Sequence, residues 1–152
     1  MRCCTRRRAR CACTGRPEAA RQTLTRFSQG NVFISTAPLR MDRMAAECDL
    51  ALCHGGAGTT AALLLAGKPM VLIPSQMEQT MAAHRLAAMG AAMVITPDLA
   101  MHFPKMLARA MVDTKLQDAA QAFARAHENY DQQATIAAAA DRCESALLRA
   151  AT

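Results

Sequence analysis

The sequence lacks tryptophan and is poor in aromatic residues, since four phenylalanines and one tyrosine make up 3% of its 152 residues. Apolar residues still make up 52% of the chain. This composition excludes a disordered chain and predicts an interior packed with alanine, leucine and methionine side chains. The length suits one domain with a hydrophobic core.

Long hydrophobic runs and zinc-ligand motifs are also missing. The longest apolar run, residues 61–66, is about a third of the roughly 20 residues that a membrane-spanning helix needs. No stretch resembles the hydrophobic part of a secretory signal, and no cysteine pair has the spacing of a zinc site. We therefore expect a cytoplasmic protein without a membrane span or a metal, whose Cys48, Cys53 and Cys143 act as small hydrophobic residues.

Acidic residues are scarce at the start of the chain. Residues 1–26 contain eight arginines and one glutamate, whereas the remainder is close to neutral. The net charge of +6 therefore belongs to the start, and we do not expect the globular part to bind nucleic acid. Residues 1–16 have no apolar periodicity, and we interpret them as a disordered or non-native start. A mitochondrial transit peptide or a nucleic-acid-binding arm is the alternative, and residues 17–150 form the predicted domain.

A glycine turn is the motif on which the functional interpretation depends. An apolar run, residues 50–53, ends at His54 and the turn 55–58, and an Ala/Leu segment then continues without a helix breaker to Gly67. This order predicts a strand, a tight turn and a helix. Helix N-termini present unpaired N–H groups with partial positive charge, and glycines let an anion approach them. The turn is therefore a candidate phosphate site.

A second loop is expected beside the first. The turn Gly67-Lys68-Pro69 precedes an apolar strand, residues 70–73, which Pro74 ends. In a parallel sheet, ligands lie beyond the carboxyl ends of the strands. The loops at His54 and at residues 75–79 should therefore face one crevice.

The remaining pattern alternates helices with strands and predicts an α/β fold with a doubly wound parallel sheet and a helical C-terminal cover. In the helix expected over 80–89, Ala83, Leu86 and Met89 should point inward. The expected strands are 32–34, 50–53, 70–73 and 92–95, and the expected helices are 17–28, 41–47, 59–66, 80–89, 104–112, 116–127 and 132–148.

Three spaced motifs carry a family resemblance: HGGAGTT, then GKP, then PSQMEQ. Together they resemble the donor-binding signature of nucleotide-sugar-dependent glycosyltransferases of the GT-B architecture. This group includes the UDP-glycosyltransferases and their bacterial, macrolide-type relatives that glycosylate antibiotics. The resemblance runs over about residues 21–148 and implies the Rossmann-like C-terminal half of such an enzyme, with its first strands truncated.

The resemblance implies that the domain holds a UDP- or dTDP-sugar, without another cofactor, while the sugar moves to a small-molecule acceptor. Glu78 and Gln79 match the acid and amide that bind the sugar hydroxyls. At a helix N-terminus the His54 imidazole should be neutral and still donate one N–H. A structural histidine, and an exposed loop before a helix, are the alternative interpretations. The residues that match the diphosphate site are His54, Gly55, Gly56, Gly58, Thr59 and Thr60.

The sequence departs from the family in the base-binding loop. Thr36, Ala37, Pro38 and Leu39 lie where many relatives place an aromatic residue against the base, and this chain has no tryptophan. Ala62 stands where plant-type members have a glutamate for the ribose. The identity of the base is therefore open, with UDP as the default.

No catalytic residue is identified in this chain, because the family's acceptor pocket and catalytic histidine come from an amino-terminal domain that is missing here. We expect little or no sugar transfer by the chain alone. Missing strands should leave an unpaired sheet edge, which predicts low solubility or association with another chain. The alternatives are a non-catalytic nucleotide-sugar-binding module and a fragment of a cell-wall or lipid glycosyltransferase that uses UDP-N-acetylglucosamine.

Overall fold

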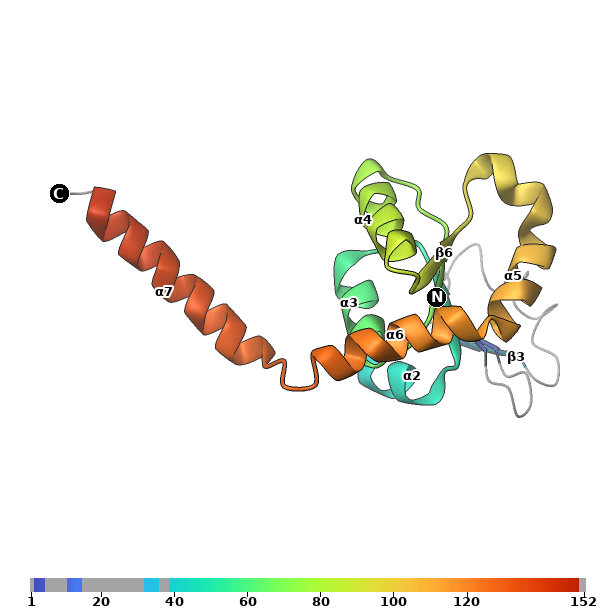
Figure 1. Ribbon diagram of the computed structural model, residues 1–152, viewed down its shortest axis with the longest axis horizontal. Helices are drawn as coiled ribbons and strands as arrows, with labels where there is room; N and C mark the ends of the chain where they lie inside the picture. Colours follow the sequence, from blue (N-terminus) through green and yellow to red (C-terminus); the bar gives the residue numbers. More distant parts are fainter. Residues whose placement is uncertain (1, 5–10, 15–31, 36–38, 151–152) are drawn as a thin grey trace.

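The computed structural model describes residues 2–4, 11–14, 32–35 and 39–150 (Figure 1). It confirms an α/β fold in which helices pack on a sheet that contains three adjacent parallel strands. The helix expected over 17–28 lies outside the described residues. The elements are β1 (Arg2–Cys4), β2 (Cys11–Thr14), β3 (Val32–Ser35), α2 (Met41–Glu47), β4 (Leu50–Cys53), α3 (Ala57–Leu65), β5 (Met70–Leu72), α4 (Met77–Ala88), β6 (Ala92–Val94), the 3-10 helix η1 (Pro97–His102), α5 (Phe103–Val112), α6 (Thr114–Ala126) and α7 (Gln132–Ala150).

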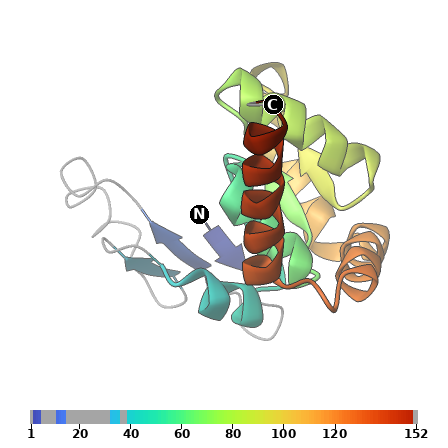
Figure 2. The ribbon, with the colours of Figure 1, turned by 90° about the vertical axis from the view of Figure 1, so that its left-hand side faces the viewer.

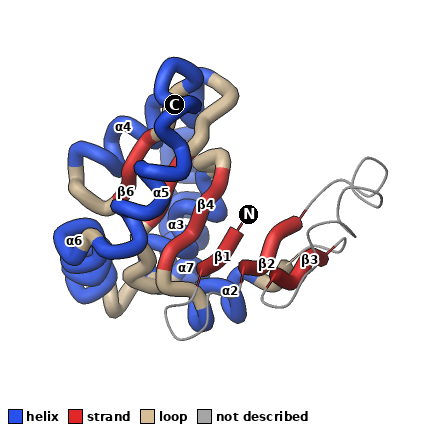
Figure 3. Tube along the Cα trace, turned by 90° about the vertical axis from the view of Figure 1, so that its right-hand side faces the viewer, coloured by secondary structure: helices blue, strands red, loops and turns tan. Residues whose placement is uncertain are grey.

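The sheet has six strands in the order β3-β2-β1-β4-β5-β6. Strands β4, β5 and β6 are parallel, with Ala51 opposite Met70 and Val71 opposite Met93. Strand β2 is parallel to β3, and β1 is antiparallel to both of its neighbours. Figure 3 shows how β1, β2 and β3 continue the sheet beyond β4. The carboxyl ends of β4, β5 and β6 meet at one edge of the sheet. The two loops predicted to bind the ligand follow β4 and β5 at this edge.

The start of the chain differs from the expectation of a segment without regular structure. Strands β1 and β2 both come from residues 1–16 and lie between β3 and β4. The edge of β4 that we expected to be unpaired therefore pairs with β1, with Cys3 opposite Ala51. Figure 2 shows these strands, in blue, to one side of the body. The pairing is explained by the unpaired N–H and C=O groups at the edge of β4. These groups can form hydrogen bonds with the backbone of an extended segment of any sequence.

The hydrophobic core lies on both faces of the parallel strands. On one face α2, α3, α4 and α6 pack against the sheet, with Leu63 and Ala83 fully buried. On the other face α5 and the start of α6 pack over Val71 and Ile95. Inward positions in α4 are confirmed for Ala83 and for the partly buried Leu86, but Met89 is 47% exposed. Met89 is the C-cap of α4, so it lies where the helix leaves the sheet.

The C-terminal helices divide into a cover and an extension. Helices α5 and α6 cover the domain, and the Asp113 carboxylate caps α6 by accepting from the N–H groups of Lys115 and Leu116. Helix α7 extends away from the body (Figure 1), and its side chains from residue 132 to 149 are all exposed. Within the described residues no helix is long and apolar enough to cross a membrane.

Glycine at the end of α3 is required by backbone conformation. Gly67 has φ +67°, and the bonds Gly67 N–H to Leu64 O (3.0 Å) and Lys68 N–H to Leu63 O (2.9 Å) form a Schellman motif. A Cβ at Gly67 would also lie 3.4 Å from the side chain of Ala124 on α6. The turn therefore fixes both the end of α3 and its packing on α6.

We expect Gly67→Ala to lower the free energy of unfolding by about 1 to 2 kcal/mol, because an L-residue is strained at positive φ. Gly58→Ala is the matched control, since Gly58 lies in α3 with open space around its Cβ position and without a positive φ. This control should be neutral or slightly stabilising, as alanine favours helices. Urea unfolding of the two variants measures the difference, and equal stabilities would contradict the argument.

Candidate functional site

The first helical turn after β4 has N–H groups without acceptors. Gly56 is the N-cap of α3, and no described side chain caps this helix. The first hydrogen bond within the helix runs from the Thr60 N–H to the Gly56 carbonyl, at 3.0 Å. The N–H groups of residues 57–59 therefore precede the ladder and point out of the helix N-terminus. An anion placed there would meet several donors and the positive end of the helix dipole.

The approach to this turn is open. A Cβ built at Gly56 or at Gly58 would meet no atom within 4 Å, and both glycines are exposed. Gly55 is buried instead, with φ +89°, and turns the chain from β4 into α3. The Thr60 hydroxyl is buried and donates to the carbonyls of Gly56 (3.2 Å) and Ala57 (3.1 Å). Gly56, Gly58 and the half-buried Thr59 therefore lie at the accessible N-terminus of α3. Gly55 and Thr60 are buried and stabilise the turn.

His54 joins the ends of β4 and β5. Its ring is exposed, and Nδ1 lies 3.2 Å from the carbonyl oxygen of Ile73. A carbonyl only accepts hydrogen bonds, so this contact assigns a proton to Nδ1. In the neutral ring the other nitrogen, Nε2, is then an acceptor. The single N–H that we expected a neutral His54 to donate to phosphate is directed at the protein backbone.

The second loop is shorter than expected, because α4 begins at Met77 rather than near residue 80. The Gln79 side chain ties the loop to this first turn: its Oε1 accepts from the Ser75 N–H (2.9 Å) and the Ser75 hydroxyl (3.2 Å). Ser75 precedes the N-cap, Gln76, which makes no side-chain cap hydrogen bond, so the contact lies one residue outside a capping box. Glu78 and Gln79 therefore lie in the first turn of α4, with Glu78 exposed and Gln79 half-buried.

The two loops lie against each other, as predicted from the parallel sheet. The Cβ position of Gly55 is 3.7 Å from the Gln79 backbone oxygen and 3.9 Å from its Cβ. These are ordinary van der Waals distances, so it is the positive φ of Gly55, +89°, that disfavours a larger residue there. The structure therefore brings the turn that precedes α3 against the first turn of α4.

The electrostatics of the site favour an anion at α3. No acidic residue lies in the first turn of α3, whereas Glu78 lies in the first turn of α4. Burial raises the pKa of the Cys53 thiol, and the Gly55 N–H offsets part of this rise. Cys53 is therefore a neutral thiol at physiological pH rather than a nucleophile. Among the described residues, no cluster of three or more histidine, cysteine or acidic side chains could hold a metal.

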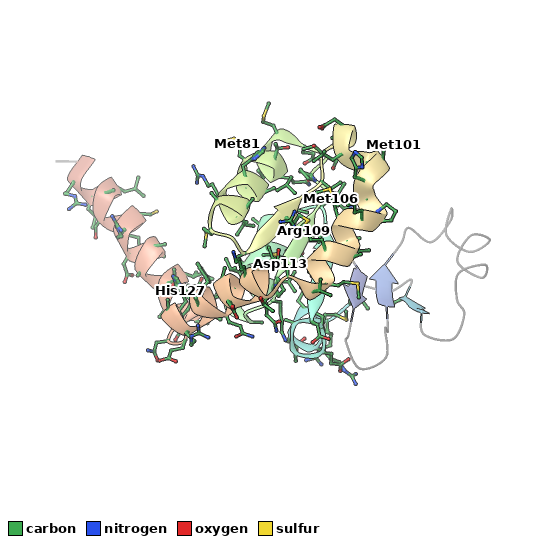
Figure 4. All side chains as sticks on the ribbon, turned by 45° about the vertical axis from the view of Figure 1, so that its right-hand side comes forward. Met81, Met101, Met106, Arg109, Asp113 and His127 are labelled. Carbon is green, nitrogen blue, oxygen red and sulfur yellow. The ribbon has the colours of Figure 1, made fainter. Side chains whose placement is uncertain are left out.

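An apolar groove of about 570 Å³ borders the site, and the sequence analysis did not predict it. Ala57 and Glu78 line it near the two helix N-termini, and Tyr130 lines it beyond α6. The rings of Phe123 and His127 also line it and stack with centroids 4.0 Å apart. Figure 4 shows Met81 on α4 and His127 at the end of α6. The groove forms only where α3, α4 and α6 meet, so no local sequence pattern encodes it.

The predicted base-binding loop is described only in part. Thr36, Ala37 and Pro38 lie outside the described residues. Leu39 is half-buried and packs against the core cluster that includes Met44. The role of this loop therefore stays a prediction.

The fold and the two loops define a class of protein: the C-terminal, donor-binding half of a GT-B glycosyltransferase. The model of the glycosyltransferase family 28 C-terminal domain matches residues 13–143, and the chain belongs to this family. No curated protein sequence matches the chain.

Solved antibiotic glycosyltransferases share the fold. The spinosyn rhamnosyltransferase SpnG complexed with spinosyn aglycone is 25% identical with a TM-score of 0.69, over 86% of this chain and 36% of that one. The calicheamicin glycosyltransferase CalG4 is 25% identical with a TM-score of 0.62, over 80% and 31%. The glycosyltransferase VinC in complex with dTDP is 22% identical with a TM-score of 0.63, over 71% and 28%. The chain therefore spans roughly a third of the length of these structures.

Proposed function

We propose that this chain binds the donor of a glycosyltransferase that moves a hexose from a UDP- or dTDP-sugar to a small-molecule acceptor. The observation that carries the proposal is the open, uncapped N-terminus of α3 beside the first turn of α4. The structures of VinC and SpnG with thymidine diphosphate support dTDP as a nucleotide to test beside UDP.

The site suits the departure of a diphosphate. Breaking the bond to the sugar builds negative charge on the leaving diphosphate, so fixed N–H donors stabilise the transition state more than the ground state. In the proposed complex the N–H groups of residues 57–59 and the His54 ring hold the diphosphate. Glu78 accepts from sugar hydroxyls and Gln79 donates to them. Because the helix supplies the positive field, we propose that no resident metal is needed.

We further propose that the chain alone transfers sugar slowly or not at all, since none of its residues is assigned to acceptor activation. A second candidate function is a nucleotide-sugar-binding module that acts without catalysis. This chain matches only about a third of each solved glycosyltransferase. That partial match supports a module that binds the donor without catalysis. Transfer to a macrolide or flavonoid acceptor at rates typical of enzymes would exclude it.

Isothermal titration with UDP, dTDP and GDP tests the proposal. We expect UDP or dTDP to bind, and His54→Ala to weaken binding about 10- to 100-fold, the size of a lost hydrogen bond to a charged group. EDTA should leave the affinity unchanged. His127→Ala is the matched control, because this exposed histidine also places Nδ1 against a backbone carbonyl (Phe123 O, 2.9 Å), at the end of α6. Absence of binding by all three nucleotides, or equal effects of the two substitutions, would overturn the proposal.

A further inference from the structure

Ser75 presents two donors to a single oxygen of the site. Its backbone N–H and its hydroxyl lie 2.9 Å and 3.2 Å from Gln79 Oε1. The backbone N–H can only donate, so the carboxamide must turn its oxygen, and not its nitrogen, toward Ser75. The pair of contacts thereby selects one of the two orientations that an amide group can adopt.

The selected orientation determines what Gln79 can offer to a ligand. With Oε1 held by Ser75, the Nε2 amino group points away from Ser75 and keeps two N–H donors. Glu78, the neighbouring residue, is exposed and supplies acceptors only. A carbohydrate hydroxyl both donates and accepts, so a fixed donor at Gln79 beside an acceptor at Glu78 can bind two hydroxyls of one sugar. A freely rotating amide would present its oxygen part of the time and lose this complementarity.

We infer that Ser75 is a positioning residue that sets the sugar contribution to donor affinity through the amide of Gln79. This inference rests on the proposed function, because it assigns Gln79 to the sugar and not to the diphosphate. Ser75 itself need not touch the donor. Its effect should appear as a change in the affinity of the nucleotide-sugar relative to that of the nucleotide.

The experiment compares UDP with UDP-glucose, and dTDP with dTDP-glucose, by isothermal titration of the full chain. The quantity of interest is the ratio of the two dissociation constants within each pair. Ser75→Ala removes the hydroxyl contact and keeps the backbone N–H contact, so we expect it to lower the sugar-dependent gain in affinity about threefold, the low end of the effect of one lost hydrogen bond. The affinity for UDP or dTDP alone should stay unchanged. Ser75→Thr keeps the hydroxyl and should restore the gain.

Two further variants separate positioning from helix capping. Thr80→Ala removes another hydroxyl of the same turn, which donates to the Gln76 carbonyl at 3.0 Å without contacting the Gln79 amide. If Ser75 only stabilised the start of α4, Thr80→Ala would lower the gain as well, and that result would overturn the inference. In a Gln79→Ala background, Ser75→Ala should have no further effect on the gain.

The outcomes distinguish this inference from the proposed function. Nucleotide binding by the unchanged chain, with equal gains in Ser75→Ala and wild type, overturns the role of Ser75 and leaves the diphosphate site intact. A UDP-sugar and a dTDP-sugar that bind no more tightly than their nucleotides also overturn it. Absence of any nucleotide binding overturns the proposed function itself, and the inference with it.

Discussion

Gly56→Asp is expected to stabilise the fold and to abolish the binding of UDP and dTDP. Gly56 is the N-cap of α3 with φ −61° and ψ 137°, the backbone conformation that suits an N-cap aspartate, and its Cβ position is open. The new carboxylate would accept from the N–H groups of the first turn and would place a negative charge at the dipole's positive end. It would therefore occupy the donors that we assign to the diphosphate.

The two effects have opposite signs, which makes the variant informative. Capping should add a few tenths of a kcal/mol to the free energy of unfolding, up to about 1 kcal/mol. Binding should weaken by about 100-fold or more, because at least one charge-assisted hydrogen bond is lost and a like charge is added. Urea unfolding and isothermal titration measure the two quantities on the same sample.

Two variants at the same position separate the contributions. Gly56→Asn caps the helix without a charge and should reduce binding less than aspartate does. Gly56→Ala adds only a methyl group to the open approach and provides no cap, so any loss of binding there reports steric exclusion. Unchanged UDP and dTDP affinity in Gly56→Asp would show that the anion does not lie at α3. In that case the assignment of Gly56 and Gly58 would be wrong.

The local part of the site could be predicted because it is encoded by neighbouring residues. The bounds of β4 at Leu50–Cys53 and of α2 at Met41–Glu47 agree with the sequence pattern. The turn at Gly55 follows from glycine's tolerance of positive φ, and the meeting of the two loops follows from parallel strands. Each of these inferences needs only a short segment or a topological rule.

The features that were missed depend on contacts between distant segments. Strand β1 forms because the edge of β4 offers backbone partners, and no periodicity in residues 1–16 announces this pairing. The sequence pattern predicts the start of α4 too late because its N-cap, Gln76, is not a standard capping residue and makes no side-chain cap hydrogen bond. The groove needs α6 to cross beside α3 and α4. Strand β1, the start of α4 and the groove therefore depend on side-chain geometry and tertiary packing rather than on secondary-structure propensity.

His54→Gln is expected to retain more affinity for UDP and dTDP than His54→Ala. Because Nδ1 faces the Ile73 carbonyl at 3.2 Å, a ring that keeps this contact reaches a phosphate oxygen only through an N–H at Nε2. Phosphate oxygens accept hydrogen bonds, and a glutamine amide always carries two N–H donors. Glutamine can therefore replace the donor that alanine removes.

Isothermal titration of the wild type, His54→Gln and His54→Ala with UDP and dTDP measures the three affinities. We expect His54→Ala to bind about 10- to 100-fold more weakly than the wild type and His54→Gln to lie between the two, since a hydrogen bond to a charged group is at stake. Equal affinities of the wild type and His54→Ala would show that the ring does not contact the diphosphate, and His54 would then serve only to tie β4 to β5.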